Sequence, residues 1–327
     1  MLGMLCNHDD VARFVPTTAF CSLEAEADRG HWCALDARHG RVLLSAGKGM
    51  GIHVHLVVWD PITDEERMLP LPAQCSAVSI WWTAAVLCAD AAAAGACDHL
   101  DCHRRHFVVV LLGCVLHGPD AGQCFVCTYA SKTAAWTEPM YTEQQPDSLV
   151  VSMVSALVGN ALYFKELFGS RVVKYNLELH QVSLIVLPSS IPHCYQSDVL
   201  IATENGELGL AINQGSKLCF WLRNQLDDAC KVRDEWQKPS RDIEFKTLLP
   251  ADAALSKLYL VGAAEGLGII FVRADDVVYT IDLKTYKVKK VYEGEIKSIV
   301  PYMSFYTPAL EAACTGGEGP SVGGSNA

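Results

Sequence analysis

Five segments of this chain resemble one another, and their spacing constrains the fold more than any other feature. Each combines an apolar run, an aromatic residue and, in most cases, an Asp or Asn opening a polar turn: LVVWDPIT (56–63), FVCTYASK (125–132), VVKYNLEL (172–179), CFWLRNQ (219–225) and VVYTIDLK (277–284). Tyr129, Tyr175 and Trp221 follow one another at intervals of 46 residues. A fixed period of about 40–50 residues with four strands per period is typical of a β-propeller.

The stretch from His31 to Pro72 shows what one repeat contains. It predicts four antiparallel strands, HWCALD, RVLLSA, HVHLVVWD and RMLPLP, separated by the turn ARHG, the loop KGMG and the polar turn DPITDEE. Asp, Pro and Thr favour turns. The two prolines of the last strand suit an outer edge, because proline cannot donate to a strand ladder.

Four further units follow, at about 79–139, 149–188, 198–248 and 255–293. The dipeptide Asn205-Gly206 is a strong hairpin signal inside one of them. Helical periodicity is almost absent, and a pair of β-sandwiches, the alternative all-β fold, would not produce the repeat.

The two ends of the chain each leave one strand without a partner, at residues 11–20 and 295–306. We assign both to a shared sixth blade. The sequence therefore predicts an all-β propeller of six four-stranded antiparallel blades over residues 1–306. Gly and Ser dominate residues 307–327, which we predict to be a disordered tail.

The net charge of the chain argues for or against particular classes of binding partner. The 327 residues contain 26 Lys and Arg against 37 Asp and Glu, a formal net charge of −11. This argues against non-specific binding to nucleic acid or to anionic membranes, which requires clustered basic residues. The most apolar window, Val78 to Cys97, contains Asp90 and is rich in alanine, so we interpret it as a strand followed by a small-residue loop instead of a membrane span.

The chain has 14 scattered cysteines, no signal peptide at its start and no Asn-X-Ser/Thr sequence. This pattern predicts a cytoplasmic or nuclear protein with mostly buried free thiols.

Two groups of residues have the composition of a metal site. The first is a cluster with short spacings, Cys97, His99, Asp101, Cys102, His103 and His106. Zinc binds such residues, but a structural site usually needs a second matching pair, and we favour a polar loop. The second is His53 and His55, which would share one face of a strand without an obvious third ligand. We assign no metal residue and no cofactor.

Three other motifs have a functional and a structural interpretation. Cys124 and Cys127 form a Cys-x-x-Cys, but residues three apart in a strand point to opposite faces, which argues against a redox pair. Gly47 to Gly51 resembles a phosphate loop only loosely, and a hairpin loop fits better. Of Trp81 and Trp82, one must face outward; it is either a binding anchor or a cap on the seam between blades. No catalytic motif stands out, and we assign no catalytic residue.

Several segments together resemble a large family of plant F-box proteins, especially those of grasses: HWCALDARHGRVLL, LVVWDPITDEERMLPLP, AAVLCA with CDHLDCH, SALVGNALYF, TENGELGLA, SKLCFW, FKTLLP and PYMSFYTPALEA. The resemblance runs from about residue 13 to 313. It implies a kelch-like, propeller-type F-box-associated domain and a role as substrate receptor of an SCF-type ubiquitin ligase, in which the F-box binds the Skp adaptor and the propeller captures the target protein.

The sequence departs from the family pattern at its start, where MLGMLCNHDD stands in place of a Leu-Pro-rich helical F-box. We therefore expect a protein-recognition module, not an enzyme, that does not bind the Skp adaptor by itself. Two alternatives remain: a propeller enzyme with its site in the central channel, and a non-catalytic scaffold. A receptor should carry aromatic residues and Arg around a rim, whereas an enzyme should bring two or more carboxylates or histidines together at the channel mouth.

Overall fold

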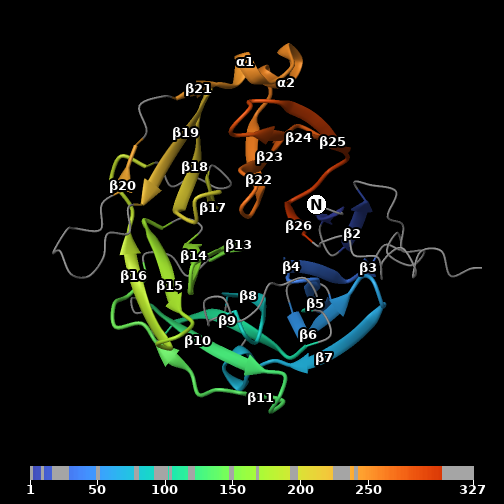
Figure 1. Cartoon of the computed structure of the whole chain (residues 1–327), viewed down its shortest axis with the longest axis vertical. Helices are drawn as coiled ribbons and strands as arrows, with labels where there is room; N and C mark the ends of the chain where they lie inside the picture. Colours follow the sequence, from blue (N-terminus) through green and yellow to red (C-terminus); the bar gives the residue numbers. More distant parts are fainter. Residues whose placement is uncertain are drawn as a thin grey trace, which may run out of the picture.

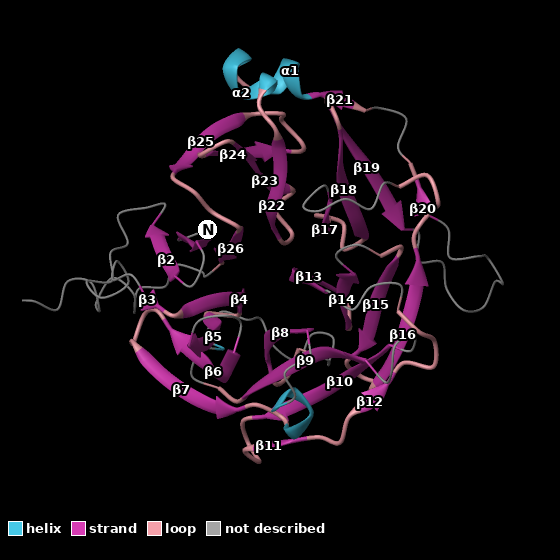
Figure 2. Ribbon diagram, turned by 180° about the vertical axis from the view of Figure 1, so that it is seen from behind, coloured by secondary structure: helices cyan, strands magenta, loops and turns pink. Residues whose placement is uncertain are grey.

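The computed structural model describes residues 3–8, 11–16, 29–48, 52–76, 81–91, 102, 105–116, 122–146, 151–166, 169–191, 198–223, 236–238 and 242–303. These residues form six antiparallel sheets arranged as blades around one axis (Figures 1 and 2). The predicted fold, an all-β propeller of six blades, is confirmed.

In each of the first three blades, the chain begins at the strand nearest the axis of the ring and ends at the outermost strand. Blade 1 consists of β4 (Trp32–Arg38), β5 (Arg41–Lys48), β6 (Ile52–Asp60) and β7 (Glu65–Pro70), followed by the short helix η1 (Ala73–Ser76). Blade 2 consists of β8 (Trp81–Cys88), β9 (Phe107–Leu116) and β10 (Gly122–Ala130), with its outer position shared by β11 (Ala135–Trp136) and β12 (Met140–Tyr141). Blade 3 consists of β13 (Val151–Val158), β14 (Ala161–Glu166), β15 (Arg171–Asn176) and β16 (Gln181–Val186).

The other three blades complete the ring. Blade 4 consists of β17 (Asp198–Ala202), β18 (Leu208–Gln214) and β19 (Lys217–Arg223), with β20 (Trp236–Gln237) and β21 (Ile243–Glu244) outside. The helices α1 (Phe245–Leu248) and α2 (Ala251–Leu255) lead to blade 5, which consists of β22 (Leu258–Ala264), β23 (Ile269–Ala274), β24 (Val277–Asp282) and β25 (Val288–Glu293). Blade 6 consists of β26 (Ser298–Tyr302), β1 (Gly3–His8), β2 (Val11–Pro16) and β3 (Arg29–Gly30).

Both faces of a blade are buried, which explains why the inner strands read as continuous apolar runs. In β8, Ala84 and Val86 belong to the cluster packed against blade 1, while Ala85 and Leu87 belong to the cluster packed against blade 3. Side chains alternate along a strand, so each neighbouring blade receives every second residue. None of the helices in the described part of the chain is long and apolar enough to cross a membrane.

A repeated turn accounts for much of the sequence repeat. At the end of the third strand in three blades, an Asp or Asn side chain accepts a backbone N–H from the second or third residue after it, and the fourth residue after it has a positive φ. The Asx residues are Asp60, Asn176 and Asp282, and the positive-φ residues are Asp64 (56°), His180 (51°) and Tyr286 (56°). Short polar side chains satisfy such turns locally, which is why they recur at fixed spacing.

The ring closes as predicted, by strands from both ends of the chain, but the closing blade contains a strand that the sequence analysis missed. The C-terminal β26 pairs with β1, and β1 pairs with β2. Residues 3–8 looked like a short apolar run before a polar turn. Their side chains are buried only because the far end of the chain supplies the neighbouring strand, and this long-range pairing leaves little local signal.

The outer strands of blades 4 and 2 depart from the four full strands that the repeat predicts for each unit. The segment IEFKTLLP (243–250) is not a strand beyond Glu244; it continues as α1, because Phe245 is buried in the cluster between blades 4 and 5. The outer strand of that blade includes β20, which follows the charged segment QLDDACKVRDE (225–235) in sequence. In blade 2, only Ala135 and Trp136 of the segment AAWTEP (134–139) form a strand, β11; Pro139, which has no N–H for the ladder, separates it from β12.

Asn7 holds the closing blade against blade 1. Its side chain donates to the carbonyl oxygen of Ala34 at 2.7 Å and to Ser298 Oγ at 2.9 Å, and it accepts the Ala34 N–H at 2.8 Å. Ala34 lies in β4 opposite Leu44 of β5, beside a break in strand register. The amide therefore links β1, β26 and β4.

We expect Asn7→Ala to lower the free energy of unfolding by about 2–4 kcal/mol, because it leaves buried backbone groups of Ala34 unsatisfied. Urea denaturation measures the change. Asn160→Ala, which removes one exposed bond to Glu178, is the matched control and should cost less than about 0.5 kcal/mol. Equal effects of the two substitutions would show that the clamp contributes nothing specific.

A buried ion pair joins blades 3 and 4. Lys165 Nζ on β14 lies 3.1 Å from Asp198 Oδ2 on β17, and it also donates to the Glu166 carbonyl oxygen at 2.8 Å. Burial raises the pKa of Asp198 to about 6, although Lys165 opposes this shift. The folded protein therefore binds this proton more tightly than an unfolded chain, in which the pKa is near 3.8.

The free energy of unfolding should consequently fall as pH rises from about 4 to about 6, by at most about 3 kcal/mol from this group. The variant Asp198→Asn should lose that part of the pH dependence, even if its overall stability is lower. Urea denaturation at a series of pH values tests this, with the exposed Asp252→Asn as control. A slope unchanged in Asp198→Asn would contradict the assignment.

Candidate functional site

Strand direction divides the propeller into two faces. The turns that join first to second and third to fourth strands lie on one face, which we call the turn face. The connections between blades, including η1, α1 and α2, lie on the opposite face, which we call the linker face. Antiparallel neighbours impose this division, because successive strands of a blade alternate in direction.

An ion network occupies the centre of the ring near the turn face. Arg38 of β4 donates through Nε to Glu265 Oε2 at 2.8 Å, and through its terminal nitrogens to Ser155 Oγ at 3.1 Å and to the Ser155 carbonyl oxygen at 3.0 Å. It also bonds Asp36 Oδ1 and Glu265 Oε1. Its side chain is 6% exposed.

Both carboxylates of this network have backbone donors as well. The Val86 N–H donates to Asp36 Oδ2, and the Leu157 N–H donates to Glu265 Oε1, each at 2.7 Å. Burial raises the pKa of Asp36, an effect that Arg38 partly offsets. Burial also opposes the charge on Arg38, but the two carboxylates raise its pKa on balance. The network thus connects blades 1, 2, 3 and 5.

The network bears directly on the enzyme alternative. Two carboxylates do meet at the axis, as a channel enzyme would require, but both are already engaged by Arg38 and by backbone N–H groups. Groups held in this way stabilise the ring, since each carboxylate oxygen of Asp36 and Glu265 accepts at least one hydrogen bond from Arg38 or from a backbone N–H.

The metal-like residues are not brought together within the described part of the chain. Cys102 is buried, and its carbonyl oxygen accepts from Arg41, while His106 is exposed. Cys97, His99, Asp101 and His103 lie outside the described residues. The described residues contain no group of three or more His, Cys, Asp or Glu that could hold a metal ion. His53 and His55 both lie on β6, as predicted, opposite Gly47 and Ala46.

The two cysteines of the Cys-x-x-Cys motif face different blades, as predicted: Cys124 belongs to the cluster between blades 2 and 3, and Cys127 to the one between blades 1 and 2. Cys124 forms a disulfide with Cys114, the residue that pairs with it on β9. Burial raises the pKa of Cys127 to about 11, so this thiol stays protonated. The disulfide was not foreseen, because only strand register brings residues 114 and 124 face to face.

The remaining described cysteines, all free, are Cys6, Cys33, Cys75, Cys88, Cys102, Cys127 and Cys219, and all except Cys33 are buried. Gly47 to Gly51 connects β5 to β6, with residues 49–51 outside the described part, so strands and not a helix flank the loop.

Trp81 and Trp82 behave as the alternation of a strand requires. Trp82 packs against the cluster between blades 1 and 2, where it covers the seam. Trp81 begins β8 on the linker face and is 58% exposed. The predicted outward-facing residue of the pair is therefore Trp81, and whether it is a binding anchor stays a prediction.

Several uncharged side chains are exposed at the linker-face ends of blades 2 and 3, a region that we call the blade 2–3 rim. The rim consists of Trp81, Gln123, Tyr141, Gln144, Gln145 and Val186, all at least partly exposed and none charged. Tyr141 is 42% and Val186 is 60% exposed, and their strands, β12 and β16, lie in contact. Strand register places these two aromatic residues on opposite faces of the blade 2 sheet: Trp81 pairs with Cys114, whose side chain faces blade 3, whereas Tyr141 pairs with Phe125, whose side chain faces blade 1.

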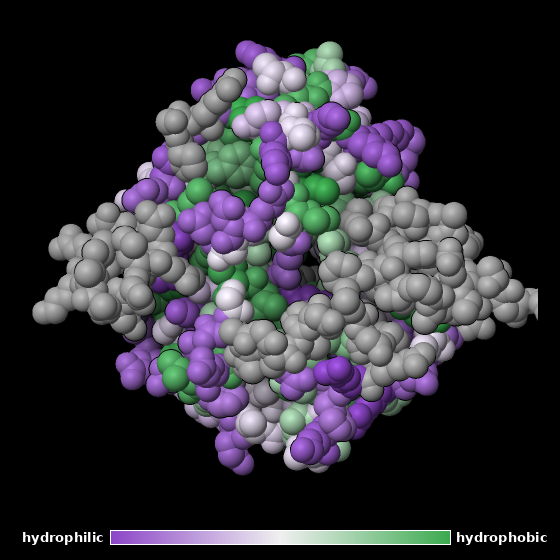
Figure 3. Space-filling model, viewed as in Figure 1, coloured by the Kyte–Doolittle hydropathy of each residue, from purple (hydrophilic) through white to green (hydrophobic). Residues whose placement is uncertain are grey.

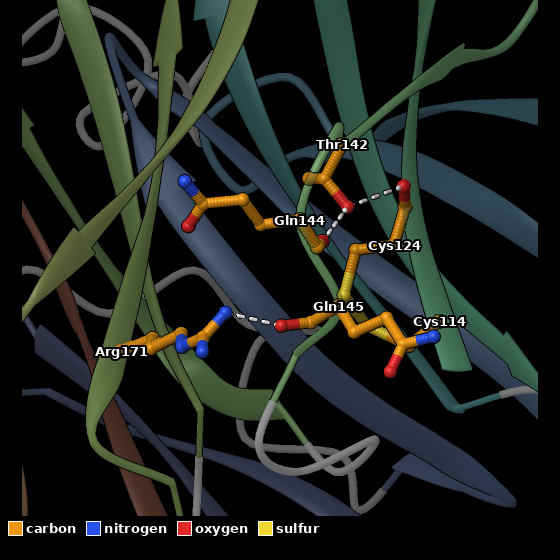
Figure 4. The surroundings of a disulfide bond; sticks show 6 residues. All are labelled: Cys114, Cys124, Thr142, Gln144, Gln145 and Arg171. Carbon is orange, nitrogen blue, oxygen red and sulfur yellow. Dashed lines mark hydrogen bonds between the residues drawn. A yellow bond between two sulfur atoms is a disulfide. The ribbon is translucent and has the colours of Figure 1, made fainter. Parts of the chain in front are cut away.

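The rim stands on a tightly connected support (Figure 4). The disulfide joins β9 to β10 directly beneath it, and Thr142 donates its N–H to the Cys124 carbonyl oxygen at 2.9 Å. Thr142 Oγ1 donates to the Gln144 carbonyl oxygen at 2.9 Å. Arg171 of blade 3 donates to the Gln145 carbonyl oxygen, so the loop between the blades is held from both sides.

Charged residues are common among the exposed residues of the turn face. They include Glu65, Glu66, Asp90, Arg105, Lys132, Glu178, Glu204, Lys284 and Lys287. Leu179, 60% exposed, lies there beside Glu178. On the face drawn in Figure 3, hydrophobic residues occur in small groups separated by hydrophilic ones.

A closed ring of six four-stranded blades, joined by strands from both chain ends and locked at its axis, defines a propeller domain with its free surfaces on two faces. The sequence model of the family described as "F-box protein AT5G49610-like, beta-propeller" matches residues 33–310. The chain belongs to this family, which confirms the resemblance seen in the sequence and indicates a protein-interaction module.

Comparison with curated proteins gives no match. Among solved structures, the chain is similar to one in a nidogen/laminin complex (11% identity, TM-score 0.47, covering 92% of this chain and 98% of that one). It is also similar to the extracellular domain of the putative one component system BT4673 from B. thetaiotaomicron (13% identity, TM-score 0.41, 81% of this chain) and spans 28% of that chain. A putative 6-phosphogluconolactonase from Bacteroides fragilis matches at 9% identity and TM-score 0.42, over 78% of this chain and 67% of that one. These likenesses concern the chain path, and no function follows from them.

We expect Arg38→Met to lower the free energy of unfolding by about 3–5 kcal/mol, because it leaves two buried carboxylates without their counter-charge. Adding Asp36→Asn and Glu265→Gln to that variant should restore part of the loss. The control is Arg105→Met, whose exposed side chain lies 3.9 Å from Asp90 and should contribute at most about 1 kcal/mol. Thermal unfolding of the four proteins would refute the network's role if Arg38→Met and Arg105→Met behaved alike.

Proposed function

We propose that this propeller is the target-capturing part of an SCF-type ubiquitin ligase receptor, acting in the cytoplasm or nucleus and without catalytic activity of its own. Membership of an F-box propeller family is the observation that supports the proposal most directly. Target recognition by a propeller requires a rigid ring with accessible faces, and the axial network and the Asn7 clamp supply that rigidity.

The structure also bears on how such a receptor would join its ligase. An F-box contacts its adaptor through an apolar helical surface. In this chain, Met4, Leu5 and Cys6 are buried within β1, and Ala12 and Phe14 within β2. These residues are committed to the closing blade. Adaptor binding therefore needs an F-box segment joined upstream of Met1.

The rival function, catalysis in the channel, would need a free acid or base at the axis. The two axial carboxylates are bound to Arg38 and to backbone donors, which favours recognition over chemistry.

The test compares residues 1–327 with the same chain carrying an F-box fused upstream of Met1. We expect purified Skp adaptor to bind only the fusion, with micromolar or tighter affinity by calorimetry. In plant extract supplemented with the ligase components, both proteins should retain the same target proteins. Only the fusion should lead to their ubiquitination, measured by mass spectrometry.

Two outcomes would contradict the proposal in different ways. Saturable adaptor binding by residues 1–327 alone would show that the closing blade or another surface replaces an F-box. Retention of targets without ubiquitination by the fusion would show a recognition module that works outside a ligase.

A further inference from the structure

We propose that the outer edge of β16 is a docking site at which an extended segment of a target protein adds a fifth strand to the sheet of blade 3. The inference rests on the proposed function, since it names the surface and the chemistry by which the propeller captures its target.

The outer edge of β16 lacks the features that protect the other outer edges of the propeller. An exposed strand edge pairs readily with another chain, and proteins prevent this with charged residues, proline or very short strands. The sequence of β7, EERMLP, has three charged residues and a proline, and that of β25, VKKVYE, has three charged residues. The outer strands of blades 2, 4 and 6 are two residues long. β16, with the sequence QVSLIV, has six residues and neither a charge nor a proline.

Hydrogen bonding shows which backbone groups of β16 point outward. The Leu187 N–H donates to the Ser170 carbonyl oxygen at 2.7 Å, which places residues 181, 183 and 185 in hydrogen-bonded pairs with β15. In an antiparallel pair, hydrogen-bonded and non-hydrogen-bonded residues alternate along the strand. The N–H and C=O groups of Val182, Leu184 and Val186 therefore point away from β15. Among the described residues, no other strand pairs with them.

The side chains of β16 define the alternation expected of the ligand. Val182 and Leu184 pack into the cluster between blades 2 and 3, and Val186, on the same side, is 60% exposed. On the opposite side, Ile185 packs between blades 3 and 4, and Ser183 is exposed. Neighbouring strands match side chains face by face. We therefore expect a segment with apolar residues at every second position, directed toward blade 2, and with polar residues between them.

The charge of the chain and the size of the edge favour a target segment over a second copy of this chain. Each copy has a formal net charge of −11, so two copies repel one another at short range. A pair of six-residue strands is only about 20 Å long and buries much less than the roughly 1,200–2,000 Å² of a stable interface. Smaller interfaces belong to transient complexes, which suits a receptor that binds and releases its targets.

The edge is ordered before a ligand binds. β16 pairs with β15 at all six of its residues. In the turn before it, the Asn176 side chain accepts the N–H groups of Glu178 and Leu179 at 3.0 and 2.8 Å. After it, Leu187 and Ile191 are buried in the cluster between blades 3 and 4. Docking therefore costs conformational entropy mainly in the ligand.

The position of the edge keeps it accessible in a ligase. The blades follow one another around the ring in chain order, so blade 3 lies opposite blade 6 (Figure 1). An F-box joined upstream of Met1 would enter the propeller at β1 in blade 6. The β16 edge then lies on the far side of the ring, where a target segment would not collide with the ligase.

The first experiment selects binders from a phage library of random peptides of about ten residues against residues 1–327. We expect the selected peptides to carry apolar residues at every second position. Synthetic copies of the best peptide are then N-methylated at one residue at a time. Methyl groups on alternate residues should weaken binding by about tenfold or more, whereas those between them should change it less than about threefold, because only every second N–H of an added strand faces β16.

Val186→Pro is the corresponding change in the propeller. It removes an outward N–H of β16 without breaking a bond to β15, and an edge position of this kind tolerates proline. We expect the affinity for the best peptide to fall by about tenfold or more, because one bond is lost and the ring obstructs the added strand. Leu179→Ala is the matched control, since Leu179 is also 60% exposed but lies in the turn before β16. It should leave the affinity unchanged.

Thermal unfolding shows whether both variants are folded, and the N-methylation series uses the wild-type chain, so it decides the question even if Val186→Pro lowers stability. Three results would overturn the proposal: no peptide selected, N-methylation that acts equally at all positions, or equal binding by wild type and a folded Val186→Pro. Concentration-dependent dimerisation in analytical ultracentrifugation that Val186→Pro abolishes would show instead that the edge joins two copies of this chain.

The peptide experiment contains no ligase component. Its failure would therefore leave the ubiquitination test unaffected, and the failure of that test would leave binding at the β16 edge intact.

Discussion

The ion network around Arg38 is the interaction on which the rest of the ring depends. Each blade is held together by its own strand ladders, and the blades meet mainly through side-chain packing, which is non-directional. Arg38, Asp36 and Glu265 add directional bonds between blades 1, 2, 3 and 5 at the point where all inner strands converge. Burying such charges is costly unless every one is paired, and here the backbone donors of Val86 and Leu157 complete the pairing.

The axial ion network and the closing blade hold the ring together independently of its two faces. Because the centre is occupied by the network and the ends of the chain meet in blade 6, the ring can stay rigid without contributions from its exposed loops. Side chains exposed on the linker face are therefore not needed to close the ring. The blade 2–3 rim illustrates this: its backbone is held by the disulfide and by Thr142, whereas the side chains of Trp81 and Tyr141 project to solvent.

The sequence predicted the candidate site in part, and the parts it missed have a common physical cause. Adjacent Trp81 and Trp82 in a strand required that one face outward, because alternation is a local rule. Nothing local linked Trp81 to Tyr141 or Val186, which come from other strands and another blade. The pairing of Cys114 with Cys124 depended on strand register, and the central meeting of Arg38 with Glu265, 227 residues apart, depended on ring closure.

By itself, the sequence determined the repeat, the all-β class, the six blades and the positions of most turns, because these arise from patterns within about 50 residues: apolar strands, Asx turns and glycines with positive φ. Only the tertiary structure decided that residues 3–8 form a strand, that IEFKTLLP turns helical after Glu244, and which carboxylates meet at the axis. Those outcomes depend on which distant segment supplies a neighbour. Local propensity says nothing about that choice, whereas burial against the neighbour outweighs propensity once the ring has closed.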